Sequence, residues 1–194
     1  MDLRVAAALA AVAVLWAPAA HADAAGSAED GATAAEQELA STYAPVMMLV
    51  RQDEPCGPGE PYLPSDVDAM FNESSIALRG PWTGRDLVGV APSVEQLAAG
   101  LEGYSLDLPG DPLKPGCSYE KWVTSVWGPD PAPVIYAHVA TQSGVEDRIA
   151  LQYFFYYPFN DYNNKHEGDW ERIQIEFPVG DVEEALTTEP DLVL

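Results

Sequence analysis

The chain has 194 residues, 47% of them apolar, and a formal net charge of −22 from 31 Asp and Glu against 9 Lys and Arg. A disordered acidic tail would lack this many aliphatic and aromatic side chains, so we expect a folded protein. Neutralising phosphates requires a basic face, so the charge excludes nucleic acid as a partner and disfavours docking on anionic lipid. The charge is compatible with binding divalent cations, although it also serves solubility.

The N-terminus has the three parts of a secretory signal. Arg4 lies in a short start, Val5–Trp16 is an apolar run, and Ala20 and Ala22 are the small residues of a cleavage site. A helix needs about 20 residues to span a bilayer, and the apolar run is too short. We therefore expect a secreted protein with no transmembrane segment in its mature chain. The expected organisation is a signal peptide over 1–22, a disordered N-terminus over 23–34, and a single β-rich domain over 35–194.

Short elements between loops are expected in the first part of the domain, because twelve of the 17 prolines fall between Pro55 and Pro133. Capping residues and apolar spacing mark the elements themselves. In chain order we expect a helix over 36–43 that stops at Pro45, a strand over 46–51, a helix from an N-cap at Ser65 to Phe71, a strand over 75–79, and a helix opened by the capping box of Ser93 and Gln96 and ending near Ala99.

The last third of the chain contains three segments rich in β-branched and aromatic residues, at 134–141, 148–157 and 170–177. Their lengths and the turns between them favour an antiparallel sheet over a doubly wound α/β fold. The whole pattern predicts a mainly β fold with a few short helices and Pro/Gly-rich loops.

The two cysteines, Cys56 and Cys117, are expected to form a disulfide, because export places them in an oxidising compartment. Both lie in Pro/Gly-rich loops, which lack regular hydrogen bonding. In the chain-entropy model, closing a loop of about 60 residues stabilises the fold by about 4 kcal/mol. The alternative is a zinc or redox pair, but the chain has no C-x-x-C motif.

The third of these strands places a carboxylate among apolar side chains. Residues two apart share a face of a strand, so Glu171 shares a face with Ile173 and Ile175. A carboxylate that points into a core costs several kcal/mol unless it is paired or coordinated. The pattern therefore predicts a site at the start of this strand.

A cluster of potential metal ligands precedes the strand. Carboxylate oxygens with one imidazole favour Ca²⁺, Mg²⁺ or Mn²⁺ over structural zinc. The spacing fits neither an EF-hand nor a zincin, and the alternative is an acidic turn whose carboxylates cap backbone groups or form salt bridges. We expect the other histidine of the mature chain, His138, to be packed or hydrogen-bonded in its strand. The candidate ligands are Asp161, His166, Glu167, Asp169 and Glu171.

The segment YNNKHEGDWERIQIEF at 162–177, with the preceding LQYFFYYPFND at 151–161, resembles the signature of the vacuolar protein sorting-associated protein 62 family. The segment from Tyr43 to Phe71 is similar to the opening of the same family, and the resemblance covers about Ala40 to Val182. The Gly-Asp-Trp-Glu core is also similar to the Gly-His-Arg-His-Asp-Trp-Glu motif of the necrosis- and ethylene-inducing-like toxins. Those toxins are secreted β-sandwich proteins that hold a divalent cation and recognise plant sphingolipid head groups.

The resemblance implies an antiparallel β-sandwich with a divalent-cation site. His166, Asp169 and Glu171 fall on the first His, the Asp and the Glu of the toxin motif, and Asp161 lies near its upstream Asp. The second His of that motif is Gly168 here, so one polar contact of the toxin site is absent. Family members continue with further strands, so we expect this chain to be truncated at its C-terminus.

Three functions remain open at this point. The first is a secreted module that binds a glycan or lipid head group, with aromatic surface from Trp170, Tyr162 and Tyr157; the alternative for these three side chains is core packing. The second is a metal-assisted hydrolase with Glu167 or Glu171 as general base, although the sequence offers no nucleophile–base pair. The third is a purely structural extracellular domain. The oligomeric state cannot be derived from the sequence.

Overall fold

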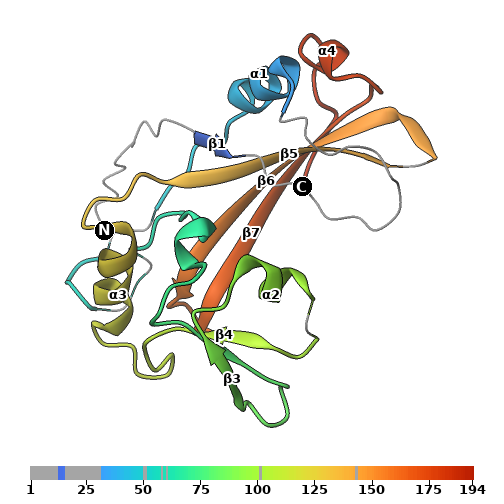
Figure 1. Cartoon of the computed structure of the whole chain (residues 1–194). Helices are drawn as coiled ribbons and strands as arrows, with labels where there is room; N and C mark the ends of the chain where they lie inside the picture. The colour runs from blue at the N-terminus through green and yellow to red at the C-terminus, as the bar shows by residue number, and fades with distance from the viewer. Residues whose placement is uncertain are drawn as a thin grey trace. The chain divides into compact units, whose positions relative to one another are not determined.

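The structure is a computed structural model that describes residues 13–15, 32–49, 52–57, 59, 61–100, 102–142 and 144–194 (Figure 1). Most of the predicted signal peptide and N-terminus therefore lies outside the described residues. The elements are β1 (Ala13–Leu15), α1 (Ala34–Thr42), the 3₁₀ helix η1 (Val67–Met70), β2 (Ala77–Arg79), β3 (Leu87–Val90), α2 (Val94–Ala98), β4 (Ser105–Asp107), α3 (Ser118–Trp127), β5 (Val134–Gln142), β6 (Val145–Asn160), β7 (His166–Phe177), α4 (Val182–Ala185) and β8 (Leu192–Val193).

Most of the predicted elements are confirmed. The Ser93 and Gln96 capping box opens α2, since each side chain binds the backbone N–H of the other residue. The helix predicted from Ser65 is the short η1, and its N-cap is Asp66. The strand predicted over 46–51 is wrong for its described part, because 44–49 has no regular structure and Val46 is exposed. The sequence did not predict β3, β4 or α3.

The chain forms two compact units, each built from segments that are distant in sequence. The described part of unit 1 lies in Met48–Pro133 and Tyr156–Trp170, and that of unit 2 in residues up to Met47, Val134–Phe155 and Glu171–Leu194. The strands β6 and β7 run through both units, so the tip of their hairpin belongs to unit 1.

Unit 1 contains an antiparallel sheet in the order β3-β2-β4 and an aromatic core, against which Leu106 of β4 packs. Tyr119 of α3 stacks on Phe159 of β6 with ring centroids 3.9 Å apart, and Trp122 donates its indole proton to Ser75. The predicted disulfide is confirmed: Cys56 and Cys117 are bonded, and they connect the start of α3 to the loop around Glu54.

Unit 2 contains the antiparallel strands β5-β6-β7-β8, and β1 pairs in parallel with β5. One face of this sheet is apolar, with Leu151 and Tyr153 buried at its centre. Helix α1 covers that face, because the Tyr153 hydroxyl donates to the Ala40 carbonyl and Tyr43 packs edge-on against Phe177. The other face carries mostly polar side chains.

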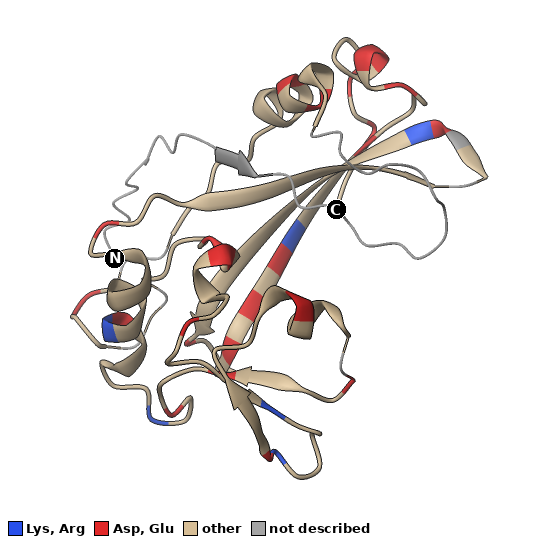
Figure 2. Ribbon diagram, viewed as in Figure 1, with Lys and Arg blue, Asp and Glu red and all other residues tan. Residues whose placement is uncertain are grey.

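The predicted mainly β fold, with antiparallel sheets and few short helices, is confirmed. A β-sandwich further requires two sheets to pack face to face, and this part stays a prediction. In the part of the chain that the structure describes, no helix has the length and hydropathy to cross a bilayer. Acidic side chains are spread over the helices, strands and loops of both units (Figure 2).

Candidate functional site

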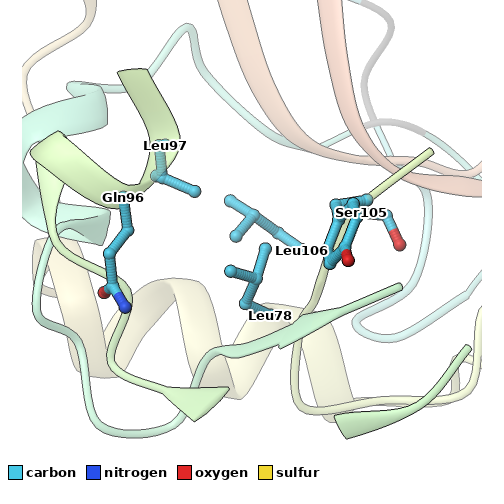
Figure 3. Close-up of a pocket in the computed structure, with 6 residues that line it drawn as sticks. Leu78, Gln96, Leu97, Ser105 and Leu106 are labelled. Carbon is cyan, nitrogen blue, oxygen red and sulfur yellow. The ribbon is translucent and has the colours of Figure 1, made fainter. Parts of the chain in front are cut away.

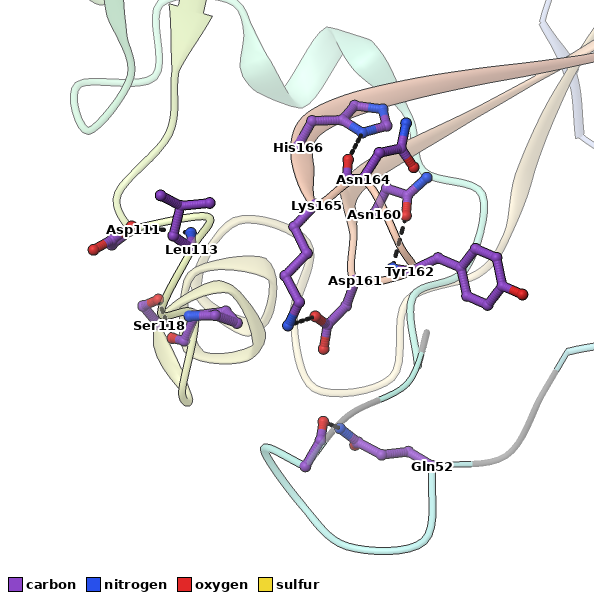
Figure 4. Close-up of polar contacts among 12 residues, drawn as sticks. Gln52, Asp111, Leu113, Ser118, Asn160, Asp161, Tyr162, Asn164, Lys165 and His166 are labelled. Atoms are coloured by element: carbon purple, nitrogen blue, oxygen red, sulfur yellow. Dashed lines mark hydrogen bonds and ion pairs between the residues drawn. The ribbon is translucent and has the colours of Figure 1, made fainter.

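Four of the five predicted ligands lie at or near the tip of the β6–β7 hairpin in unit 1, and the fifth, Glu171, is the first residue of β7 that belongs to unit 2. Figure 4 shows how the turn between the strands directs its polar side chains into separate contacts. The Asn160 carboxamide oxygen accepts the Tyr162 N–H at 2.8 Å and shapes the turn. Gly168, the third residue of β7, has a φ of +67°, a conformation that other residues rarely adopt.

Glu167 points into unit 1. One of its carboxylate oxygens accepts the Tyr119 hydroxyl proton at 2.5 Å, and the other accepts the Leu108 N–H at 3.0 Å. Burial raises the pKa of Glu167 above its ordinary value, while the two hydrogen bonds act in the opposite direction. Both oxygens are therefore already engaged in contacts that dock the hairpin tip.

The remaining acidic ligands have other partners. Asp161 forms an ion pair with Lys165 (Figure 4). Asp169 accepts a hydrogen bond from the Asn160 amide at 3.0 Å, and the His166 Nε2 lies 3.5 Å from its second oxygen. The other ring nitrogen of His166, Nδ1, lies 2.7 Å from the Asn164 carbonyl oxygen. His166 and Asp169 are thus the only two of the five predicted ligands for which the structure shows a mutual contact.

The prediction that Glu171 points into an apolar core is wrong. Glu171 and its neighbour Arg172 are exposed, and Ile173 is only half-buried, whereas Ile175 and Phe177 are buried. The alternation of β7 is real, but the core lies only under the C-terminal half of the strand. The carboxylate of Glu171 therefore remains in water and carries no desolvation cost.

The five predicted ligands do not assemble into a metal site. Among the described residues, no group of three or more His, Cys, Asp and Glu side chains is arranged to hold a metal ion. The hydrogen bonds of Glu167 and the ion pair of Asp161 point these carboxylates at protein groups. The donor set that the resemblance implies therefore does not fit a divalent cation in this arrangement.

The three predicted ligand-binding aromatics have different surroundings. Tyr162 is 66% exposed and Trp170 is 52% exposed, so both present aromatic surface. Trp170 also packs on Tyr156, with ring centroids 5.2 Å apart. Tyr157 packs against the aromatic core of unit 1, as the core-packing alternative expected.

A second candidate site, which the sequence did not predict, lies on the polar face of the unit 2 sheet. Side chains from three neighbouring strands form a continuous hydrogen-bonded chain, which we call the polar row. The Gln152 amide donates to the Gln174 oxygen at 2.7 Å, and the Gln174 amide donates to Glu176 at 2.8 Å. The members of the polar row are His138, Gln152, Gln174, Glu176 and Arg148.

Arg148 ends the polar row in a double ion pair. Its guanidinium donates to both oxygens of Asp191 at 2.8 Å and to Glu176 at 3.1 Å. The hydrogen bond from Arg148 holds the pKa of Asp191 below its ordinary value. The positive charge at this end of the row is therefore balanced by two carboxylates of the same unit.

The polar row borders a groove of about 320 Å³. Ala140 and Ala150 lie opposite each other in the β5–β6 register, and their small side chains leave space between the longer polar ones. The remaining lining residues are Thr141, Gln142, Val145, Arg148, Ile149, Gln152, Gln174 and Glu176.

A second hollow lies in unit 1 beside α2 and is smaller, about 120 Å³. Figure 3 shows Leu78, Leu97 and Leu106 converging in it. The Gln96 side chain at its rim is engaged in the capping box of α2. Its size and its leucine lining do not suit a large polar ligand.

The alternation of polar and apolar residues in β7 shows that Gln174 and Glu176 share a face, and this much is readable from the sequence. The polar row itself depends on the register that sets His138 opposite Gln152. The register of two paired strands depends on both strands and on the connection between them. The hydrogen-bonded contacts of the polar row could therefore not be predicted from one strand's sequence.

Comparisons of the chain with protein-family models, with curated proteins and with solved structures find no match. The resemblance to the vacuolar protein sorting-associated protein 62 family therefore stays a prediction from the residues quoted above.

Proposed function

We propose that the protein is a secreted binding module of the β-sandwich type that holds a neutral glycan in the groove beside the polar row. The observation that carries this proposal is the hydrogen-bonded chain of Gln152, Gln174 and Glu176 along an open groove of about 320 Å³. Sugars are polyhydroxylated and need many donors and acceptors at once.

The glutamines of the polar row supply such groups. A carboxamide has two N–H donors and an oxygen with two lone pairs. Within the row, Gln152 and Gln174 each donate one amide proton to a neighbour, so each retains a second proton and acceptor capacity for a ligand. Since the row already holds these side chains in place, binding costs little of their conformational entropy.

The charge at the groove favours an uncharged ligand. Arg148 is paired with Asp191 and Glu176, and the chain as a whole carries a net charge of −22. An anionic sugar would have to compete with two carboxylates for the guanidinium, against the repulsion of the whole protein. The prediction is therefore a neutral oligosaccharide rather than a uronic acid polymer or a phosphorylated head group.

Isothermal titration with neutral hexose oligomers, and with oligogalacturonate as the anionic probe, tests the proposal. We expect the wild-type protein to bind a neutral oligomer and the Q152A/Q174A variant to bind it at least about tenfold more weakly, equivalent to about 1.4 kcal/mol. The Q37A variant is the matched control, because Gln37 lies on the exposed surface of α1.

Three results would contradict the proposal: no binding of any neutral oligomer, equal binding by the wild type and Q152A/Q174A, or preference for the anionic probe. Chromatography of the oligomer after the titration separates binding from hydrolysis. An intact oligomer supports a binding module, and shortened products would instead favour the hydrolase hypothesis.

A further inference from the structure

The β2–β3 hairpin of unit 1 exposes an unusual amount of apolar surface for a protein of this charge. Within β3, Leu87 is 58% exposed, Val88 50% and Val90 62%. Trp82, in the turn that precedes β3, is 67% exposed, and the Arg85 guanidinium lies 5.8 Å from the centre of its ring. Exposed apolar side chains gathered on one hairpin are typical of an interaction site.

This surface is also the edge of a sheet. In the order β3-β2-β4, β3 pairs with β2 on one side, and among the described residues no strand pairs with its other side. Free edges are normally protected by a charged side chain, a proline, a bulge, a very short strand or a covering element. β3 has only four residues, and its pairing with β2 has a register shift between Leu78 and Arg79. The sequence Leu-Val-Gly-Val of β3 contains neither charge nor proline.

The apolar side chains of β3 do not take part in the packing of this sheet against α2. Leu78 of β2 is buried, and it meets Leu106 and Leu97 on the face that α2 covers (Figure 3). In the register of the sheet, Leu87 lies opposite Arg79, and Val90 lies opposite Ala77. Leu87 and Val90 therefore remain available for a contact outside the unit.

The local charge allows a second copy of the same chain to approach. Between Ala77 and Val90 the charged residues are Arg79, Arg85 and Asp86, and Arg79 is already paired with Asp107 of β4. The hairpin is thus nearly neutral in a molecule of net charge −22. Two copies that meet at this hairpin keep most of their negative charges outside the contact.

We propose that two copies of the chain associate through β3, with the two strands antiparallel across a two-fold axis. An antiparallel edge is self-complementary, so one contact of this kind closes the assembly and leaves no further free edge at β3. The pair joins two three-stranded sheets into one sheet of six strands, pairs the open backbone N–H and C=O groups of β3, and brings the apolar side chains of Leu87, Val88 and Val90 beside those of the other copy.

Sedimentation velocity of the purified full chain over a range of protein and salt concentrations tests this proposal. We expect a monomer–dimer equilibrium. Added salt should strengthen it, because screening to a Debye length of about 8 Å at physiological ionic strength weakens the repulsion between the two acidic molecules. Association held by ion pairs would respond to salt in the opposite direction.

The V88K variant places a charge on the edge and should weaken dimerisation at least tenfold, or about 1.4 kcal/mol. The matched control is L113K, because Leu113 is likewise an exposed aliphatic residue but lies outside the hairpin. V90K repeats the test should V88K fail to fold, which circular dichroism monitors. A monomer at every concentration, a dimer insensitive to both edge variants, or a dimer that salt dissociates would each overturn the proposal.

Discussion

The hydroxyl of Tyr119 donates to the carboxylate of Glu167 at 2.5 Å, and this contact joins α3 to the tip of the β6–β7 hairpin. The two residues are 48 positions apart in the chain. The ring of Tyr119 also stacks on Phe159 of the same hairpin, so one side chain contributes both a polar and an apolar contact to the docking. The hairpin tip was predicted as a metal site, and in the structure one of the predicted ligands, Glu167, instead docks the tip on unit 1.

Replacing Tyr119 by Phe keeps the stacked ring and removes the hydroxyl. The carboxylate of Glu167 then loses its shortest hydrogen bond while it remains half-buried. We expect unfolding to become easier by about 1–3 kcal/mol, the usual cost of leaving a buried charged group short of a partner. Urea denaturation followed by circular dichroism measures this, with Tyr162→Phe as the control because Tyr162 is exposed. Equal stability of the two variants would show that the Tyr119–Glu167 contact contributes nothing.

Glu167 also makes stability depend on pH. Burial raises its folded-state pKa above the ordinary value of 4.5, so between the two values the folded protein binds more protons than the unfolded chain. The stabilisation from this group is therefore present below pH 4.5 and is lost as the pH rises through the folded-state pKa. We expect the free energy of unfolding of the wild type, relative to Glu167→Gln, to fall over that interval. A difference that is constant with pH would contradict the raised pKa.

Reduction of the Cys56–Cys117 disulfide should destabilise unit 1. The bond joins residues 61 positions apart, and a loop of this length corresponds to about 4 kcal/mol in the chain-entropy model. We expect the urea midpoint of the C56A/C117A variant to drop accordingly. Dithiothreitol should lower the midpoint of the wild type and leave that of the double variant unchanged. A wild type insensitive to the reductant would show that the disulfide does not support the fold.

Divalent cations should not change the stability of the hairpin tip. Glu167 and Asp161 are bound to protein groups, and among the described residues no third His, Cys, Asp or Glu joins His166 and Asp169. We expect the thermal midpoint to be the same with EDTA as with added Ca²⁺, Mg²⁺ or Mn²⁺. An increase with one cation that disappears in the H166A/D169A variant would restore the metal site as a rearranged form of this cluster.

Export makes a prediction about the N-terminus. Cleavage after Ala22 would give a mature chain that begins at Asp23. We expect intact-mass spectrometry of the protein secreted by an export-competent host to show this start. An A20R/A22R variant should keep the full mass, because a signal peptidase requires small residues at these positions. Accumulation of the uncleaved wild type inside the cell would contradict the predicted signal peptide.

Local features could be predicted from the sequence because they depend on interactions between residues that are close together in the chain. The Ser93 and Gln96 capping box is complete within four positions, and the polar and apolar alternation of β7 follows from strand geometry alone. The pairing of Cys56 with Cys117 followed from the count, because the chain has only two cysteines. Helix α3 was missed for a local reason as well, since its N-cap residue is Cys117 and makes no side-chain capping bond.

Only the tertiary structure decided what these elements do. Glu167 accepts a hydrogen bond from Tyr119 because the fold places α3 beside the hairpin tip. Gln152 meets Gln174 because β6 and β7 are neighbours in the sheet, and Glu171 is exposed because the buried part of β7 begins only at Ile175. Contacts between distant segments depend on register and topology, which no short stretch of sequence specifies. The sequence by itself therefore determined most of the elements and the disulfide, while long-range packing decided which polar groups are engaged and which remain available for a ligand.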